Sequence, residues 1–338
     1  MTTFTSHGGF VIYGKQTSSG TAVAPTATVP FPRTSEWTIS NQLIEVDSIG
    51  RAEPADLLPG FADVRCNFEA YLTPYDHNWF GYVLGRRIKT TVSDAVTQFK
   101  AQCAATNNSA TITFYTGVEE SSEAKVMIEG CRPDSLTFTA RAGEVVTYSV
   151  NLIGRQPTLS TTATKPSFVD IQPFIFADGY VKARIGSDSL ATIANIEEIN
   201  FTINNNLEQL PSINKSDGRV VHEIAQNQRR IAGEMTIRFE NLTYQQWVMG
   251  GSGSNTPENT LATISVDVYL EQNKLIPGAS ATNYSCHIYM PKVKFGEGGF
   301  RVGTNEILTY RIPFSAFYDS SDTAITVTIE NEKDDWDE

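Results

Sequence analysis

Hydrophobic and polar residues alternate with a period of two along much of the chain. Residues 145–153 read VVTYSVNLI and residues 261–270 read LATISVDVYL, and similar runs occur at residues 109–115 and 323–329. Runs rich in Thr, Val, Ile and Tyr that end at Gly, Asn, Asp or Pro are typical of strands with one buried face. The pattern therefore predicts a mostly β protein.

Two short segments carry helix signals instead. Thr73 stands at a possible N-cap and Pro74 at the first helical position, and the segment runs to Gly85, a natural stop. Residues 243–246 read TYQQ, a capping box of the T-x-x-Q type, and that segment ends at two glycines. We predict one short helix in each place, with Trp79 and Trp247 as the residues that anchor each helix in its domain core.

An internal duplication connects these elements. Five landmarks recur in the same order: WTISN at 37–41 with FTINN at 201–205, a strand at 64–72 with one at 235–242, the helix of Trp79 with that of Trp247, ATIT at 110–113 with ATIS at 262–265, and EVVTYSV at 144–150 with EILTYRI at 306–312. An ordered set of this length indicates two copies of one fold with loop insertions. We expect copy one at residues 1–154 and copy two at residues 167–320.

The segments outside the repeat are also informative. Residues 155–166 form a polar, proline-containing linker. Copy one has an extra segment near residues 86–103, and copy two has, at a different place, a longer loop near residues 271–285. The final segment, residues 321–338, contains a strand outside the duplicated unit that is free to pair, for example with a neighbouring chain. Its acidic end is expected to be a solvated tail or a docking element.

Two long connections are the best candidates for function. Residues 42–63 and 207–230 each join two strands that the pattern pairs, and connections of about 20 residues inside a compact β domain are often functional. Their apolar residues favour an arm that reaches another subunit over a mobile surface loop. The candidate residues are Leu43, Ile44, Glu45, Asp47, Arg51, Glu53, Asp56, Leu57, Leu58, Leu210, Ile213, Lys215, Asp217, Arg219, Glu223, Arg229 and Arg230.

Composition and motifs limit the chemistry. The 338 residues carry 26 basic and 38 acidic groups, a net charge of −12, which disfavours tight wrapping of nucleic acid. The four cysteines have no C-x-x-C spacing and are expected to be reduced and mostly buried. No nucleophile elbow, phosphate-binding loop or helical metal-site spacing is present, so we assign no catalytic, cofactor or metal residues. No apolar run is long enough to span a bilayer, and no secretory signal is expected.

In this order of elements the chain resembles the major tail tube proteins of long-tailed bacteriophages. The family pattern is a strand, a long loop, a returning strand, a short helix and further strands, and residues 201–208, 231–239 and 243–249 carry it best. Residues 37–41, 66–72 and 73–84 repeat it more loosely. The resemblance implies tandem β-sandwich or half-barrel domains, each with one short helix, and loops that stack onto the next ring.

The resemblance also implies partners. Two domains per chain imply homotrimeric rings with pseudo-sixfold symmetry, stacked into a virion tube after synthesis in the host cytoplasm. The tube contacts tape measure and tail-end proteins, and the genome passes its lumen without specific binding, which an acidic lining favours. Two other classes remain open: a tandem β-sandwich module that binds glycans, as in an adhesin, and a glycoside hydrolase, whose acid/base pair a sequence does not reveal.

Overall fold

The computed structural model describes most of the chain. Described residues are 9–17, 21–47, 49–50, 52–93, 95–104, 110–118, 124–159, 163–164, 167, 170–186, 188–213, 218–296, 298–299, 308–319, 323–334 and 336. Antiparallel strands dominate these residues, and two short α-helices accompany them, so the mostly β prediction is confirmed.

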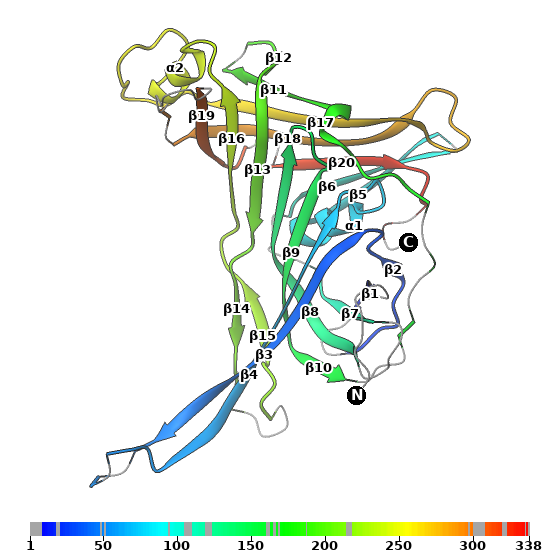
Figure 1. Cartoon of the computed structure of the whole chain (residues 1–338), viewed down its shortest axis with the longest axis vertical. Helices are drawn as coiled ribbons and strands as arrows, with labels where there is room; N and C mark the ends of the chain where they lie inside the picture. Colours follow the sequence, from blue (N-terminus) through cyan, green and yellow to red (C-terminus); the bar gives the residue numbers. More distant parts are fainter. Residues whose placement is uncertain are drawn as a thin grey trace.

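One long sheet, here called the central sheet, runs through both halves of the chain (Figure 1). Its strands pair in the order β3 (Pro32–Val46), β4 (Asp56–Tyr71), β9 (Thr147–Gly154), the second half of β8 (Lys125–Arg141), β13 (Ile196–Asn204), β16 (Arg230–Arg238) and β19 (Thr309–Ala316). Beyond β19, the last three residues of β18 (Asn283–Phe295) add a short eighth strand. The β8–β13 pairing joins the first half of the chain to the second.

Two outer sheets complete the sandwich. The first contains β2 (Ala27–Thr28), β1 (Gly9–Lys15), β7 (Ile112–Val118), the first half of β8 and β10 (Gln156–Leu159). The second contains β12 (Ala191–Thr192), β11 (Gly179–Ile185), β17 (Ile264–Leu275), β18, β20 (Thr326–Asn331), β6 (Val96–Cys103) and β5 (Gly85–Ser93). A separate hairpin comprises β14 (Leu207–Leu210) and β15 (Glu223–Gln226), and a 3₁₀ turn covers Phe176–Asp178.

The two halves have the same order of pairings. In the first, β1 pairs with β7, β7 with β8, β8 with β9, β9 with β4 and β4 with β3. In the second, β11 pairs with β17, β17 with β18, β18 with β19, β19 with β16 and β16 with β13. Both β8 and β18 begin in an outer sheet and end in the central sheet. Strands that match in sequence therefore occupy matching places in the two halves.

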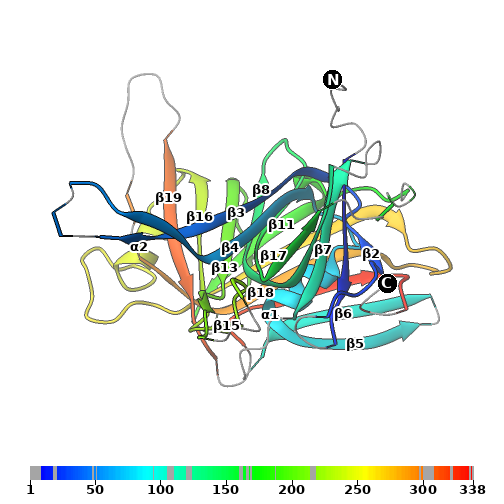
Figure 2. The same ribbon diagram turned by 90° about the horizontal axis from the view of Figure 1, so that it is seen from below.

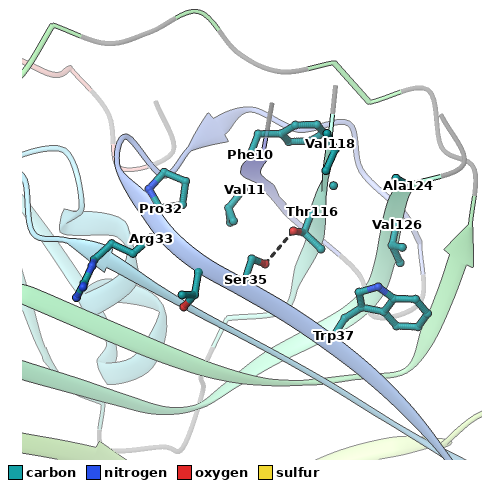
Figure 3. A pocket seen from close by; sticks show the side chains of 13 residues that line it. Phe10, Val11, Pro32, Arg33, Ser35, Trp37, Thr116, Val118, Ala124 and Val126 are labelled. Atoms are coloured by element: carbon teal, nitrogen blue, oxygen red, sulfur yellow. Dashed lines mark hydrogen bonds between the residues drawn. The ribbon is translucent and has the colours of Figure 1, made fainter. Parts of the chain in front are cut away.

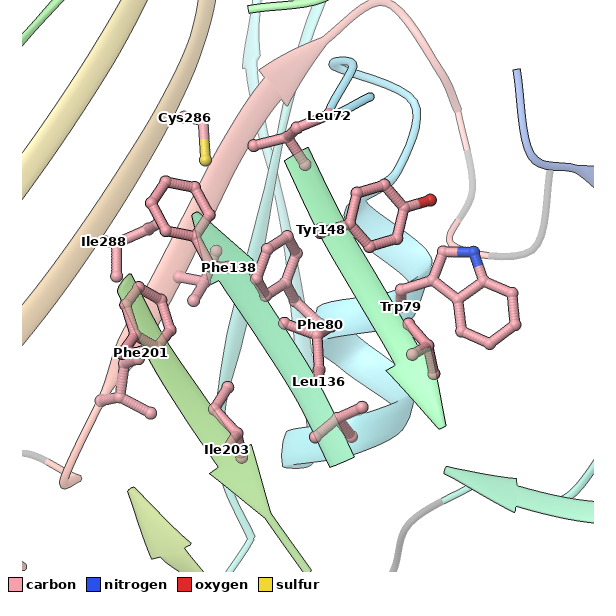
Figure 4. Packing of buried hydrophobic residues seen from close by; sticks show 14 of the residues in the cluster. Leu72, Trp79, Phe80, Leu136, Phe138, Tyr148, Phe201, Ile203, Cys286 and Ile288 are labelled. Carbon is pink, nitrogen blue, oxygen red and sulfur yellow. The ribbon is translucent and has the colours of Figure 1, made fainter. Parts of the chain in front are cut away.

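The hydrophobic core is continuous across the halves. Trp79, Phe80 and Phe138 of the first half lie in one buried cluster with Phe201 and Ile288 of the second (Figure 4). The rings of Phe138 and Phe201 stack with centroids 5.1 Å apart, directly across the β8–β13 pairing. The halves are thus joined by buried apolar contacts as well as by backbone hydrogen bonds.

Helix α1 begins later than the sequence suggested, and helix α2 begins one residue earlier. Helix α1 (His77–Leu84) has Asp76 at its N-cap, and Thr73 lies in the turn before it, where its hydroxyl donates to the Asp76 carboxylate. Helix α2 (Thr243–Met249) has Leu242 at its N-cap, and the side-chain oxygen of Asn241 accepts from the Thr243 N–H at 2.9 Å, so the predicted capping box is wrong. Every residue of α1 is buried, whereas α2 lies at the periphery with none fully buried.

Several further expectations from the sequence are corrected or decided between two alternatives. Strand β20 does not await a neighbouring chain, because it pairs with β18 on one side and β6 on the other. Of the two alternatives for the acidic end, docking applies at Trp336, which is buried against His77 and Phe99. The extra segment of copy one is the β5–β6 hairpin that receives β20. The predicted linker begins with a strand, β10, and the predicted loop at 271–285 is largely an extension of β17 and β18.

Candidate assembly surface

Strands β3 and β13 match in sequence but differ in their neighbours. Strand β13 is paired on both sides, with β16 and β8, and Phe201 and Ile203 are fully buried. Strand β3 pairs only with β4 among the described residues, so its other edge is open. Ile39, which matches Ile203, is 45% exposed, and Trp37, which matches Phe201, is half-buried. An open edge flanked by exposed apolar side chains is a template for pairing with another chain.

A pocket of about 490 Å³ lies beside this open edge (Figure 3). Trp37, Ser35 and Pro32 of β3 form one side, and Phe10 of β1 and Val126 of β8 lie on the outer-sheet side. The Ser35 and Thr116 hydroxyls are 2.8 Å apart at its base and form a hydrogen bond. The lining of the pocket contains no pair of acid and base groups, and it lies where β3 has no hydrogen-bonded neighbour besides β4 in the described part of the chain.

Asn205 closes the seam between β8 and β13. Its side-chain amide nitrogen donates to the carbonyl oxygens of Val83, at 3.1 Å, and Pro133, at 3.0 Å. Its side-chain oxygen accepts from Gln226 Nε2 at 2.8 Å and from Arg229 Nε at 2.7 Å. Asn205 is fully buried and joins the first half to the second through both ends of its amide.

The first long connection is a β-hairpin rather than a loop. Strands β3 and β4 stay paired as far as Val46 and Asp56, and the hairpin extends away from the body in both views (Figures 1 and 2). We call this hairpin, residues 42–61, the first arm. Leu43, Ile44, Leu57 and Leu58 are all about half exposed or more, and Ile49 at the tip is fully exposed. Apolar side chains concentrated on a projecting hairpin mark an interaction site.

The second connection, residues 207–229, is here called the second arm, and it folds back on the first half of the chain. Val221 and Ile224 are buried against Ile153 of β9. Two arginines of the first half fix its backbone: Arg155 Nε donates to the Val221 carbonyl at 2.9 Å, and the Arg132 guanidinium donates to the Ile224 carbonyl. The second arm is therefore held within the chain by these contacts, whereas the contacts of the first arm with the body, as far as its residues are described, lie at its base.

Arg219 of the second arm supports that base. The β3–β4 register shifts between Asn41 and Leu43, and such a bulge leaves backbone groups without ladder partners. Arg219 supplies them: its carbonyl accepts from the Ala62 N–H at 2.9 Å, and its Nε donates to the Gly60 carbonyl at 2.8 Å. A Cβ at Gly60 would lie 2.4 Å from the Gln42 carbonyl oxygen, so only glycine fits the bulge.

The face of the central sheet that points away from the core is polar and carries five arginine–carboxylate pairs. Arg65 Nε lies 2.9 Å from Asp63, and Arg238 Nε lies 2.6 Å from Glu197. The full set is Arg33–Glu69, Arg65–Asp63, Arg141–Glu198, Arg238–Glu197 and Arg311–Glu234. Hydroxyl and amide side chains lie between the pairs, and one hydrogen bond, Thr137 to Thr202 at 2.8 Å, crosses the seam between the halves.

The strongest buried electrostatic feature is Asp76, at the start of α1. Burial raises the pKa of its carboxyl group to about 6, although three hydrogen bonds to the carboxylate act in the opposite direction. They come from the Thr73 hydroxyl at 2.6 Å, the Thr73 N–H at 2.7 Å and the Tyr148 hydroxyl at 2.6 Å. The carboxyl is fully buried and its oxygens are engaged by Thr73 and Tyr148, which ties the start of α1 to β9 and gives Asp76 a structural role.

A comparison with known protein families shows the family of this chain. A family model described as "Phage tail tube protein" matches residues 6–316. The chain belongs to the phage tail tube protein family. The resemblance seen in the sequence is therefore confirmed, and a structural role in the phage tail follows from the family. A search of curated proteins finds no match.

The tail tube protein places its predicted arm residues in two different settings. Leu43, Ile44, Glu45, Asp47, Glu53, Asp56, Leu57 and Leu58 lie on the free first arm, and Leu210, Ile213, Arg219 and Glu223 lie on the second arm. Leu210 and Ile213 are exposed, unlike the buried Val221 and Ile224 that hold the second arm to the body. Arg229 is in the seam beside Asn205, and Arg230 begins β16. Arg51, Lys215 and Asp217 lie outside the described residues. Trp79 is fully buried in the core, and Trp247 packs half-buried near Phe295.

Several residues of this surface were missed by sequence reasoning. Ile39, Phe201 and Asn205 were recognised only as repeat landmarks, and the five arginines were not singled out. The repeat could have indicated Ile39, Phe201 and Asn205, because residues that match between the two copies lie on or next to the equivalent strands β3 and β13. The carboxylate partners were not visible, since four of the five pairs join residues that are 36 or more positions apart or belong to different strands.

Chemistry of other kinds finds little support in this tail tube protein. Over the described part of the chain, no group of three or more His, Cys, Asp or Glu residues could hold a metal ion. No helix among the described residues is long and apolar enough to cross a membrane. Cys66, Cys131 and Cys286 are buried thiols, and burial raises the pKa of Cys66.

Proposed function

We propose that three copies of this chain form a ring, and that rings stack into the tube through which the phage genome is ejected. The contrast between β3 and β13 carries this proposal. Within the chain, the first tandem copy contacts the second through the β8–β13 pairing. The open edge of β3 is where the same contact forms between chains, with the partner's sheet end at β19 and β18.

The dimensions of such a ring suit a conduit. Each chain contributes the seven strands of the central sheet and the end of β18, so three chains give about 24 strands. With strands about 4.8 Å apart and tilted by about 40°, the barrel is on the order of 50 Å across between backbones. Barrels of roughly 16–18 strands already enclose a water-filled channel. Closure also removes the open edges of every chain.

The two arms serve different contacts in the proposed tube, the first between rings and the second within a ring. The first arm extends the central sheet, carries exposed apolar residues and is free, which suits docking onto the next ring. The second arm is held against the first half of its own chain and strengthens the seam within a ring. A hexamer of single domains needs six seams between chains, whereas a tandem chain makes half of them internally.

The remaining partners follow from this role. Tape measure and tail-end proteins contact the tube, and DNA passes through it without specific binding, in a virion assembled in the host cytoplasm. The role is structural and not enzymatic. The glycan-binding alternative loses support because Trp79 is fully buried and Trp247 is packed, so neither offers a flat platform for sugar.

Ile39→Lys tests the proposal. Ile39 is exposed in the single chain, so the substitution leaves folding intact, but in the ring the ammonium is buried where Ile203 lies in the internal seam. We expect wild-type protein to form rings and tubes with threefold symmetry in electron micrographs, and Ile39→Lys to stay monomeric. Val92→Lys, a matched change at an exposed residue of β5, serves as the control. Assembly of Ile39→Lys, or sixfold rings of six chains, would contradict the proposal.

A further inference from the structure

The arginines on the exposed face of the central sheet are not arranged for binding phosphate. Each of the five has a carboxylate within 4.0 Å, on its own strand or the next. Arg141 has two, since Glu144 is 3.5 Å from its guanidinium as well as Glu198 at 4.0 Å. Although the chain has a net charge of −12, the charges on this face are largely balanced. Arginine–carboxylate pairs therefore stand where the sequence led us to expect a predominantly acidic surface.

Stability does not explain these pairs. The side chains are between about one-sixth and three-quarters exposed, and ion pairs in such positions contribute about 0–1 kcal/mol each. Five pairs spread over β3, β4, β8, β13, β16 and β19 also leave no part of the sheet with an uncompensated cluster of one sign. Most side chains between the pairs are uncharged: Asn151 donates to Ser135 at 2.8 Å, and Thr137 pairs with Thr202. The charged exceptions are one residue of each sign, Glu36 of β3 and Arg230 of β16, which the register places on the same face.

DNA is held by proteins mainly when cations neutralise phosphates and release counterions. A guanidinium already paired with a carboxylate adds little net positive charge, so it displaces few counterions. We propose that this pairing, and not the net charge of the chain, makes the face inert to the DNA backbone. The inference rests on the proposed function, in which this face lines the lumen, and it names a neutral rather than an acidic lining as the feature that lets DNA slide.

The test removes carboxylates while keeping the arginines. Asp63→Asn, Glu69→Gln, Glu197→Gln and Glu234→Gln together leave Arg65, Arg33, Arg238 and Arg311 without their partners. The control, Asp170→Asn, Asp188→Asn, Glu240→Gln and Glu258→Gln, changes four exposed or peripheral acids outside the five pairs and gives the same net charge. All proteins carry Ile39→Lys, so that the face stays accessible on single chains. The probe is a fluorescent DNA duplex of random sequence, followed by anisotropy at low salt.

We expect the parent and the control to show no binding, and the four-carboxylate variant to bind. The logarithm of its association constant should fall with the logarithm of salt concentration with a slope of about −3 to −4, as for four phosphate contacts. The pair Glu69→Gln/Glu234→Gln, with half the change, should give a slope of about −2 and provides a milder test if the larger variant unfolds.

Equal binding by the variant and its control, binding by the parent, or no binding by either test variant would overturn the inference. These outcomes are distinct from failure of the proposed function. Ring formation is judged by electron microscopy of the chain without Ile39→Lys, whereas the DNA experiment uses single chains and requires no assembly.

Discussion

Two strands of this protein, β3 and β13, share a sequence pattern but not an environment. In β13 the inward residues are covered by a strand on each side, and Phe201 meets Phe138 across the seam. In β3 the matching Trp37 borders an open pocket and Ile39 is exposed. Because the two strands have matching residues, the exposure on β3 follows from its missing neighbour and not from its own sequence. In the proposed ring that neighbour is another chain, arranged as β8 is at the internal seam.

The largest expected effect is on the free energy of unfolding and distinguishes the buried Phe201 of β13 from the half-exposed Trp37 of β3. Phe201→Ala should lower the free energy of unfolding by about 3–5 kcal/mol, because it leaves a cavity in the core beside Phe138. Trp37→Ala should lower it by less than half as much, since Trp37 is already half exposed in the single chain. Urea unfolding of both variants in the monomeric Ile39→Lys background measures the difference. Equal losses would mean that the two edges are energetically alike.

The second effect is on the pH dependence of stability and compares the N-caps of the buried helix α1 and the peripheral helix α2. Asp76 precedes α1, and the pKa of its carboxyl group is about 6 in the folded chain against 3.8 as the reference value. The raised pKa means that folding favours the protonated acid. Its contribution to stability is complete below about pH 4 and is lost as the pH rises through about 6, by about 3 kcal/mol in total.

Asp76→Asn should therefore flatten the dependence of unfolding free energy on pH between 4 and 7. Leu242, at the equivalent N-cap of α2, has no ionisable group, so a Leu242→Asn change should leave the dependence unaltered. Unfolding by urea at a series of pH values gives the slope for each protein. A parent protein that becomes more stable across this range, with the slope lost in Asp76→Asn, would show that the sign is wrong.

The smallest effect compares the two matching asparagines at the ends of these strands. Asn205→Ala removes a buried amide that bonds to Val83, Pro133, Gln226 and Arg229, so a loss of about 2–3 kcal/mol is expected. Asn41 is exposed, and its side-chain oxygen accepts from the Arg219 guanidinium at the surface, so Asn41→Ala should cost about 0.5 kcal/mol or less. Thermal unfolding resolves the two, and a larger loss for Asn41 would contradict the comparison.

The candidate site was only partly visible in the sequence. The apolar residues from Leu43 to Leu58 pointed to an interacting arm, and the structure places them on a projecting hairpin. Nothing local indicated that Val221 and Ile224 fold back onto Ile153, because that contact joins residues about 70 positions apart. For the same reason Arg219 could be listed as a candidate but not recognised as the support for the first arm.

Strand periodicity, the order of the repeated landmarks and the family could all be read from the sequence. Alternation decides which side chains of a strand face the core, and that information is local. The folded chain was needed to show which strand edge is covered, that β20 is inserted between β18 and β6, and that five arginines of the exposed face each have a carboxylate beside them. These features depend on which distant segments become neighbours. Any two strands can pair through their backbones almost regardless of residue type, so the sequence of one strand does not identify its partner.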